Sequence, residues 1–205
     1  MLQKETQQWA DDPAFVDAIN SVMCGGEDIL STRVILLTKT YRKPFRSIVS
    51  AGNGFTVERH FYKEVLGEGS KIGRLEIYPG MKLSVGDKVV AEYRIWNQEN
   101  RSFVKLTAPR EAAFRPVNQL SGHVGWWARP VGGTYSVTPQ GYRNVKSDRT
   151  EYFFDVYPEE NTTVTEEFFI TQEGTFTAPV VSVESLYAPH YRANDKFGGT
   201  LTVNE

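Results

Sequence analysis

The chain has 205 residues, of which 40% are hydrophobic and 13% aromatic, and its 23 basic and 25 acidic residues give a formal net charge of −2. This length and apolar content are enough for a folded core. The balanced charge, without long blocks of one sign, argues against a nucleic-acid partner and a membrane-surface patch. Cys24 is the single cysteine, which excludes an intrachain disulfide and a cysteine-rich zinc site. No apolar run is long enough to span a membrane, and the first residues, MLQKETQQWADDP, lack the apolar region of a signal peptide.

The first predicted element is a helix that begins at Asp12-Pro13 and ends before Gly25-Gly26. Asp12 is a good N-cap, because its carboxylate accepts a hydrogen bond from a free backbone N–H, and Pro13 suits the first helical position. The apolar residues of this segment fall on one stripe at helical spacing: Phe15, Ile19, Val22 and Met23. A single short amphipathic helix is marginal in water, so we expect it to pack against another element.

Strands are predicted next, over residues 33–38, 45–50, 55–65 and 75–78, each bounded by glycine, proline or charged turns. In the third of these segments the apolar alternation is interrupted at Arg59, which suggests a β-bulge. A second group of strands begins near residue 82. Residues 89–96 alternate, with Val89, Ala91, Tyr93 and Ile95 on one face, and residues 103–106 return as the second arm of a predicted hairpin.

The C-terminal part carries three further segments rich in β-branched and aromatic residues, 151–157, 163–171 and 175–187, separated by turn sequences. Their lengths and turns predict an antiparallel meander, and residues 200–203 form a final strand. The sequence therefore predicts an all-β protein, made of antiparallel β-sandwiches with one short N-terminal α-helix.

Several strings in the second group occur together in a characteristic order. They are Ser84-Val-Gly-Asp-Lys-Val89, Phe103-Val-Lys-Leu106, Phe114-Arg-Pro-Val-Asn-Gln-Leu-Ser-Gly122, Phe153-Phe-Asp155, Gly174-Thr-Phe176, Glu184-Ser-Leu-Tyr-Ala-Pro189 and Gly198-Gly-Thr-Leu-Thr-Val203. Over residues 84–203 this set resembles the C-terminal macroglobulin-type domain of bacterial alpha-2-macroglobulins. That domain occupies the position of the receptor-binding domain in animal homologues.

The N-terminal segment extends the resemblance. Gln7-Gln-Trp9, Asp12-Pro13 and Gly26-Glu-Asp-Ile-Leu30 look like the last helix of the thioester domain of those proteins. The resemblance implies three regions: residues 1–30 as the end of the thioester domain, 31–80 as a partial CUB-like module, and 82–205 as the macroglobulin-type sandwich. Because such a module would lack strands, we expect an open sheet edge within residues 31–66, which either pairs in trans as a homodimer or stays mobile.

The function that the resemblance implies is the non-catalytic C-terminal part of a protease trap, an endopeptidase inhibitor of the bacterial envelope. The chain would act as a scaffold or docking module in the periplasm or outside the cell. Its partners would be proteases, reached through a full-length parent, or another protein subunit.

The sequence offers little for catalysis or cofactor binding. In working members of the family a cysteine and a glutamine three residues later form a thioester, but here Glu27 follows Cys24, so a thioester is not expected. The three histidines, His60, His123 and His190, lack partners at metal-ligand spacing, and neither a nucleophile elbow nor a phosphate-binding loop is present. We therefore expect no catalytic residue, no cofactor and no metal.

A cluster of aromatic residues leaves two interpretations open. Trp126, Trp127, Tyr135 and Tyr142 could cover an edge of the core, or they could form a platform on which sugar rings stack. The second interpretation makes the protein a carbohydrate-binding or adhesion sandwich of the envelope. Burial of both indoles would favour the first interpretation, and exposure of both on one face would favour the second.

Overall fold

The computed structural model describes residues 45–67, 72–78, 80–131, 134–158 and 160–204. Within these residues the chain is almost entirely strand, after one short 3-10 helix, η1 (Phe45–Ser47). The all-β prediction is confirmed for this part of the chain. The predicted N-terminal helix, the strand over residues 33–38 and Cys24 lie outside the described residues.

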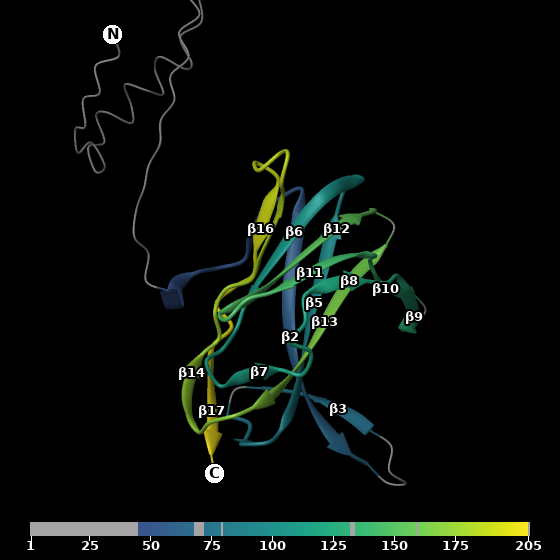
Figure 1. The fold of residues 1–205 in the computed structure, drawn as a ribbon. Helices are drawn as coiled ribbons and strands as arrows, with labels where there is room; N and C mark the ends of the chain where they lie inside the picture. The colour runs from purple at the N-terminus through teal and green to yellow at the C-terminus, as the bar shows by residue number, and fades with distance from the viewer. Residues whose placement is uncertain (1–44, 68–71, 79, 132–133, 159, 205) are drawn as a thin grey trace, which may run out of the picture. The chain divides into compact units, whose positions relative to one another are not determined.

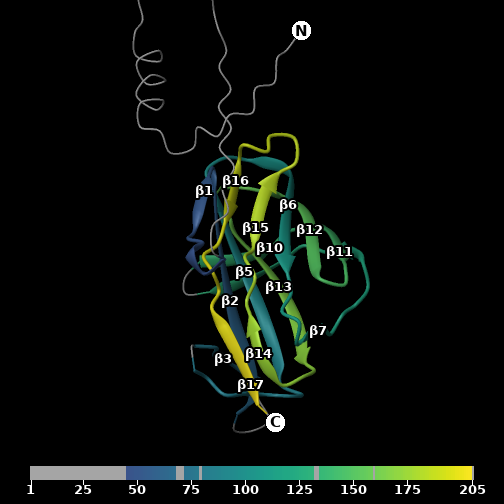
Figure 2. The same ribbon diagram turned by 90° about the vertical axis from the view of Figure 1, so that its left-hand side faces the viewer.

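One sheet, which we call sheet A, contains seven strands in the order β1-β16-β15-β6-β12-β11-β8, and all neighbours are antiparallel. Figure 2 shows β1, β16, β15 and β6 side by side. The bounds are β1 (Ala51–Asn53), β6 (Arg101–Pro109), β8 (Gly122–Val124), β11 (Gly141–Val145), β12 (Arg149–Val156), β15 (Ser182–Ser185) and β16 (Arg192–Asn194).

A second sheet, sheet B, has the order β3-β2-β5-β13-β10-β9, with β7 also paired to β13. Its bounds are β2 (Phe55–Leu66), β3 (Ile72–Glu76), β5 (Lys88–Asn97), β7 (Phe114–Pro116), β9 (Trp127–Val131), β10 (Thr134–Thr138) and β13 (Asn161–Ile170). A small third sheet, β14-β17-β4, lies near the C-terminus (Figure 1) and consists of β4 (Leu83–Ser84), β14 (Gly174–Thr177) and β17 (Thr200–Asn204).

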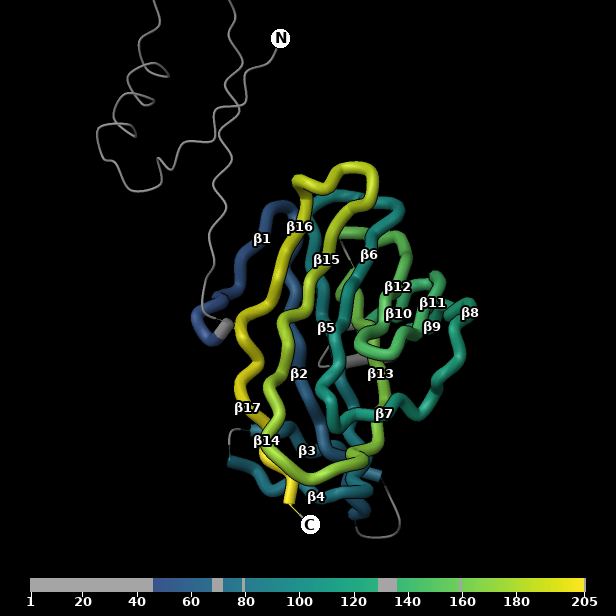
Figure 3. Tube along the Cα trace, turned by 60° about the vertical axis from the view of Figure 1, so that its left-hand side comes forward, coloured from purple at the N-terminus to yellow at the C-terminus, as the bar shows by residue number. Residues whose placement is uncertain are grey.

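The two strands of the predicted hairpin, β5 and β6, belong to different sheets. β5 pairs with β2 and β13, whereas β6 pairs with β12 and β15, so the predicted hairpin of residues 89–106 is wrong. The predicted meander is also wrong, because β12, β13, β14 and β15 alternate among the sheets (Figure 3). The connections β5–β6, β12–β13, β13–β14 and β14–β15 each lead from one sheet to another, which lets neighbouring segments cover the same core from different sides.

The core lies between sheets A and B and is filled by the inward positions of both. On β5 the predicted apolar face, Val89, Ala91, Tyr93 and Ile95, is buried as expected. On the opposite layer, Val104 and Leu106 of β6 are fully buried in the same cluster. A fully buried side chain of this kind stabilises the fold by about 1.5–3 kcal/mol, so this interior accounts for the alternation seen in the sequence.

β2 belongs to this same sandwich. Its register with β5 runs without a shift from Phe55↔Asn97 to Lys63↔Val89, so the predicted bulge at Arg59 is wrong. Arg59 instead occupies an inward position, and the polar residue interrupts the apolar pattern without interrupting the strand. The predicted boundary at residues 80–82 therefore falls between strands that share one sheet and one core.

Two expectations for the region before residue 80 are corrected. Residues 45–50, expected to be a strand, form η1 and an irregular segment before β1. The edge expected to be open within residues 31–66 is closed along the second half of β2, where β3 pairs from Tyr62↔Glu76 to Leu66↔Ile72. At this end of sheet B the edge strand is therefore β3.

Candidate functional site

An exposed apolar group lies at the turn that joins β15 to β16. Phe103 is 55% exposed and Tyr187 is 78% exposed, and their rings meet edge to face with centroids 4.9 Å apart. Leu186, the residue before Tyr187, is also exposed. We call these three residues the apolar tip. Aromatic pairs of this geometry are favourable, yet here they cover each other only in part and leave apolar surface in solvent.

The backbone holds the apolar tip in a strained conformation. Phe103 has a φ of 56°, which lies in the left-handed region that is uncommon for residues other than glycine. Its N–H donates a hydrogen bond to Oδ1 of Asp155 at 2.9 Å, and its carbonyl accepts one from the N–H of Leu186 at 3.0 Å. Strain that is fixed by surrounding bonds is typical of surfaces used for binding.

The base of the turn is held by Arg101. Its guanidinium lies 3.4 Å from the centre of the Tyr191 ring and forms an ion pair with Glu99 at 3.0 Å. Gly54, with a φ of 72°, lies close to the same ring, because a Cβ at this position would be 2.8 Å from Cδ1 of Tyr191. Tyr191 is therefore packed in place, while Tyr187 extends from the same turn into solvent.

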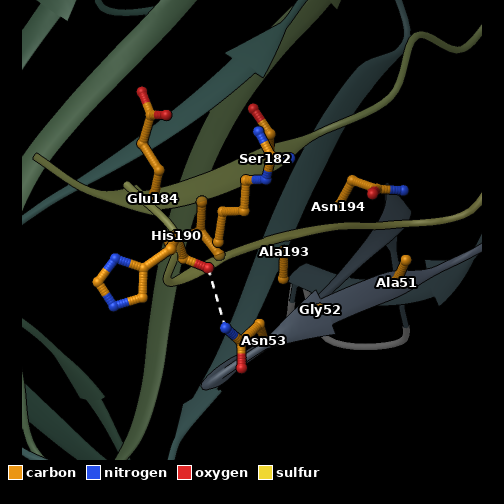
Figure 4. Close-up of a pocket in the computed structure, with 10 residues that line it drawn as sticks. Ala51, Gly52, Asn53, Ser182, Glu184, His190, Ala193 and Asn194 are labelled. Carbon is orange, nitrogen blue, oxygen red and sulfur yellow. Dashed lines mark hydrogen bonds between the residues drawn. The ribbon is translucent and has the colours of Figure 1, made fainter. Parts of the chain in front are cut away.

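A groove of about 630 Å³ runs across β1, β16 and β15, next to this turn (Figure 4). Gly52, Ala193 and Val183 form one cross-strand row along it. Glycine is required at this point, because a Cβ on Gly52 would lie 2.2 Å from the carbonyl oxygen of Phe55 and 2.9 Å from Cβ of Ala193. The close approach of β1 to the neighbouring backbone thus shapes the groove.

Polar side chains line the groove. Nδ2 of Asn53 donates a hydrogen bond to the carbonyl of His190 at 3.0 Å, which ties β1 to the turn (Figure 4). Glu184 is paired with Lys105 at 2.5 Å, and the neighbouring Arg192 is exposed. The groove therefore offers one exposed cation, a neutralised carboxylate and amide groups, which suits the recognition of a polypeptide better than covalent chemistry.

A buried ionic cluster fixes the chain that follows β16. Nη1 of Arg59 lies 3.4 Å from Oε1 of Glu111, and Nε lies 3.8 Å from Oδ2 of Asp195. Oδ1 of Asp195 accepts a hydrogen bond from the N–H of Val181 at 2.7 Å. The guanidinium also lies over the ring of Phe61, with 4.8 Å from Cζ to the ring centre. One cation from β2 thus holds a loop after β6 and a loop after β16.

Burial determines the protonation of this cluster. It raises the pKa of Glu111 to about 7 and that of Asp195 to about 6, against the attraction of Arg59, which favours the charged forms. The side chains of Arg59 and Glu111 are each only 2% exposed. Because no substrate can reach carboxylates so enclosed, the cluster is a structural anchor, in spite of pKa values that suit proton transfer.

Three of the four predicted aromatic residues, Trp126, Trp127 and Tyr142, are exposed. Trp126 is 61% exposed and Trp127 is 41% exposed, so neither indole is packed in the interior. Tyr142, on β11, is also exposed and contacts His123 of β8 edge to face, with ring centroids 5.4 Å apart. Tyr135 lies on β10, which pairs with the strand of Trp127. The structure thus places Tyr142 on sheet A and the strands of Trp127 and Tyr135 in sheet B.

The histidines do not come together. Nδ1 of His60 is 2.7 Å from Oε1 of Glu76, and His190 packs on Tyr191 with ring centroids 4.1 Å apart. Within the described ranges, no group of three or more His, Cys, Asp and Glu side chains is placed to hold a metal ion. In the same ranges, no helix has the length and apolarity needed to cross a membrane.

The sequence interpretation missed the apolar tip. Phe103 and Leu186-Tyr187 were part of the strings that carry the family resemblance, but their exposure could not be deduced from them. The available signal was a pair of large apolar residues next to Pro189, at a place where a polar turn is the ordinary choice.

The fold is a two-layer β-sandwich with exposed aromatic side chains on its surface and a buried ionic anchor. Residues 54–190 match the family described as the bacterial alpha-2-macroglobulin MG10 domain. Because this match covers more than half of the chain, the protein belongs to the bacterial alpha-2-macroglobulin family, as the resemblance indicated. No curated protein sequence matches the chain.

Solved structures of the family share the fold. Salmonella alpha-2-macroglobulin reacted with methylamine is similar with a TM-score of 0.55 and 19% identity, over 76% of this chain and 10% of that protein. The native E. coli protein gives 0.57 and 18%, over 80% of this chain and 10% of that one. An E. coli fragment from domain MG7 to the C-terminus gives 0.56 and 19%, over 79% and 25%. The chain therefore spans about a tenth of the length of the Salmonella protein.

Proposed function

We propose that this chain is a non-catalytic C-terminal part of an alpha-2-macroglobulin-like endopeptidase trap, in which it acts as a scaffold and docking module. Family membership over residues 54–190 supports the link to the trap. The solved E. coli relatives include forms activated by porcine elastase and by trypsin, which supports proteases as the partners of such a parent. The corresponding location is the periplasm or the cell envelope.

The observation that carries the docking role is the apolar tip. Phe103 and Tyr187 expose large rings in a conformation that the backbone fixes, and the groove over β1, β16 and β15 continues from the same turn. Exposed apolar groups rimmed by polar ones mark protein contacts. The occupant that we propose is another domain of the parent chain, foremost the thioester domain. In the same scheme residues 1–30 are the end of that domain.

The test compares the 205-residue chain with intact E. coli alpha-2-macroglobulin, each mixed with trypsin or porcine elastase. Cleavage of a large protein substrate and of a small peptide substrate is followed in parallel, because a trap blocks access of the large one only. We expect the E. coli protein to protect the large substrate and this chain to leave both cleavage rates unchanged. Protection of the large substrate by the chain alone would overturn the proposal.

A second candidate function is carbohydrate binding at the bacterial envelope, and the exposure of both indoles favours it. Trp126 and Trp127 are accessible on the chain between β8 and β10, and Tyr142 with His123 adds a further exposed aromatic pair on sheet A. The apolar face of a sugar ring stacks on such aromatic side chains, while the hydroxyl groups of the sugar remain in water.

Binding to insoluble peptidoglycan, chitin and cellulose separates the two candidates. If the carbohydrate function holds, the chain sediments with one of these polymers. Trp126→Ala should then raise the dissociation constant for that polymer at least about tenfold, which corresponds to the loss of one stacking contact. Leu120→Ala is the matched control, because Leu120 is similarly exposed before β8. No sedimentation with any polymer would leave the docking module as the function.

A further inference from the structure

β3 forms one end of sheet B, and among the residues that the structure describes no strand pairs with its outer edge. An edge strand can pair with another chain unless it is very short, bulged, covered, or protected by proline or charged side chains. β3 (Ile72–Glu76) has the sequence IGRLE, without proline or lysine, and its register with β2 contains no shift. It therefore presents a regular edge whose two charged residues, Arg74 and Glu76, have opposite signs.

The side chains around this edge are apolar and accessible. Ile72 is 68% exposed and Tyr78, two residues after the strand, is 61% exposed, and Leu75 lies between them with half of its surface in solvent. Large apolar side chains next to free backbone donors and acceptors are the features of a surface that adds a strand.

The backbone fixes which residues of β3 can bind a new strand. The N–H of Ile77 donates to the carbonyl of Phe61 at 2.8 Å, so the odd-numbered residues direct their backbone groups toward β2. Because these groups alternate in direction along a strand, the N–H and C=O groups of Ile72, Arg74 and Glu76 point to the free edge. An antiparallel neighbour must pair with these residues.

The charges select one register for a second copy of the chain. A two-fold axis centred on Arg74 would place the two Arg74 side chains opposite each other, and one centred on Glu76 would oppose the two Glu76 side chains. An axis centred on Leu75 instead places Arg74 opposite Glu76 of the second copy, twice, and sets Ile72 opposite Tyr78. Opposite charges directly across antiparallel strands stabilise the pair, whereas like charges destabilise it.

The neighbouring residues agree with this register. Arg74 already lies 3.9 Å from Glu64 of the same chain, and Glu76 lies 2.7 Å from His60. In the pair, Arg74 would sit between Glu64 and the second copy's Glu76, with a carboxylate on either side. Leu75 would contact its own counterpart on the other face of the sheet.

We propose that β3 is a homodimer interface, in which two copies pair antiparallel about a two-fold axis at Leu75 and join their B sheets into one continuous sheet. The two copies exchange both backbone hydrogen bonds at each Arg74–Glu76 pair, and the apolar residues Ile72, Leu75 and Tyr78 cover the junction. The interface is separate from the apolar tip, so its failure would leave the docking proposal intact.

Charge reversal tests the register directly. Sedimentation equilibrium of the 205-residue chain, from about 1 µM to about 500 µM, a range suited to small interfaces, should show a concentration-dependent dimer. Arg74→Glu and Glu76→Arg each create two like-charge contacts and should weaken dimerisation at least about tenfold. The double variant restores opposite charges and should return the dissociation constant to within about threefold of the original.

Matched controls separate this effect from net charge and from misfolding. Arg115→Glu and Glu173→Arg make the same charge changes at exposed positions away from β3 and should leave dimerisation unchanged. All variants should keep the far-UV circular dichroism spectrum of the original chain. A monomer at every concentration would overturn the proposal, and so would a double variant that stays as weak as the single ones.

A covalent test uses the residue on the axis. In a Cys24→Ser background, Leu75→Cys places each new thiol opposite its own counterpart, and air oxidation should yield a disulfide-linked dimer. Ile72→Cys, which faces Tyr78 in this register, should remain mostly unlinked. Equal linkage by the two variants would contradict the register.

Discussion

The guanidinium of Arg59 lies 3.4 Å from the carboxylate of Glu111, and both side chains are almost completely buried. Arg59 also faces Asp195, so a single cation serves two acids that come from distant parts of the chain. Ionic groups taken out of water are costly to bury and depend on each other once they are there. This relationship makes β2 an anchor for the segment that leads to the C-terminal strand.

Replacing Arg59 with methionine should destabilise the protein strongly. The substitution keeps the apolar stem but leaves Glu111 and Asp195 buried without their cation, and the loss of one partner of a buried pair costs about 3–5 kcal/mol. Urea denaturation followed by tryptophan fluorescence measures this change. Arg192→Met, at an exposed position, should change the free energy of unfolding by less than about 0.5 kcal/mol. Equal effects of the two variants would contradict the anchor role.

The same cluster should make the stability fall as the pH rises from about 4 to about 7. Burial raises the pKa of Glu111 to about 7 and that of Asp195 to about 6, above their values in the unfolded chain. At a pH between the unfolded and the folded pKa of each acid, the folded state binds more protons than the unfolded state, so unfolding becomes easier as the pH increases. The contribution is complete below about pH 4 and is lost as the pH passes through about 7.

Melting temperatures at pH 5, 6, 7 and 8 measure this dependence. Burial also raises the pKa of Glu166, so this residue acts in the same direction. Lys146 and Arg149 lower the pKa of Glu151, so the stability that Glu151 contributes is lost only at acidic pH, below the range measured here. In Glu111→Gln the decline between pH 6 and 8 should become shallower. A stability that increases over this range would be inconsistent with buried acids of raised pKa.

Gly198 is placed where a side chain would displace Arg59. A Cβ at this position would lie 2.3 Å from Nη2 of Arg59 and 2.8 Å from Cβ of Ala178. We therefore expect Gly198→Ala to lower the free energy of unfolding by about 1–3 kcal/mol, as forced overpacking does in closed interiors. Gly122→Ala is the control, because no atom would come within 4 Å of the new Cβ. Chemical denaturation that finds both variants equally stable would show that Arg59 can move without cost.

The sequence predicted strands well wherever burial alternates simply. Val89, Ala91, Tyr93 and Ile95 face the core as their spacing indicated, because one face of β5 must be apolar. The same rule failed at Arg59, where a charge occupies a core position that only distant partners, Glu111 and Asp195, make acceptable. Its partners lie far away in sequence, so local alternation could not identify the position.

Strand pairing and the exposure of large side chains could not be predicted from the sequence, because both depend on residues that are far apart in the chain. Short turns between β5 and β6 suggested a hairpin, but both strands find better-covered positions in opposite sheets. Trp126 and Tyr187 are large apolar residues that local pattern would assign to the interior, yet both are exposed. In the proposed functions this surface would contact another domain or a saccharide, which the local sequence pattern does not specify.

The two tyrosines of the β15–β16 turn should respond differently to removal. Tyr187 is mostly in solvent, so Tyr187→Ala should change the free energy of unfolding by less than about 0.5 kcal/mol. Tyr191 lies under the guanidinium of Arg101 at 3.4 Å and packs against the core, so Tyr191→Ala should cost about 2–4 kcal/mol.

Urea denaturation of both variants, with Phe103→Ala as a third, measures this contrast. Phe103→Gly should be more stable than Phe103→Ala, because glycine adopts the φ of 56° without strain while both lose the exposed ring. If the tip serves docking, its residues are kept for a contact outside the domain and not for the stability of the sandwich. A large destabilisation by Tyr187→Ala would instead make the tip part of the core and remove the main support for a docking surface.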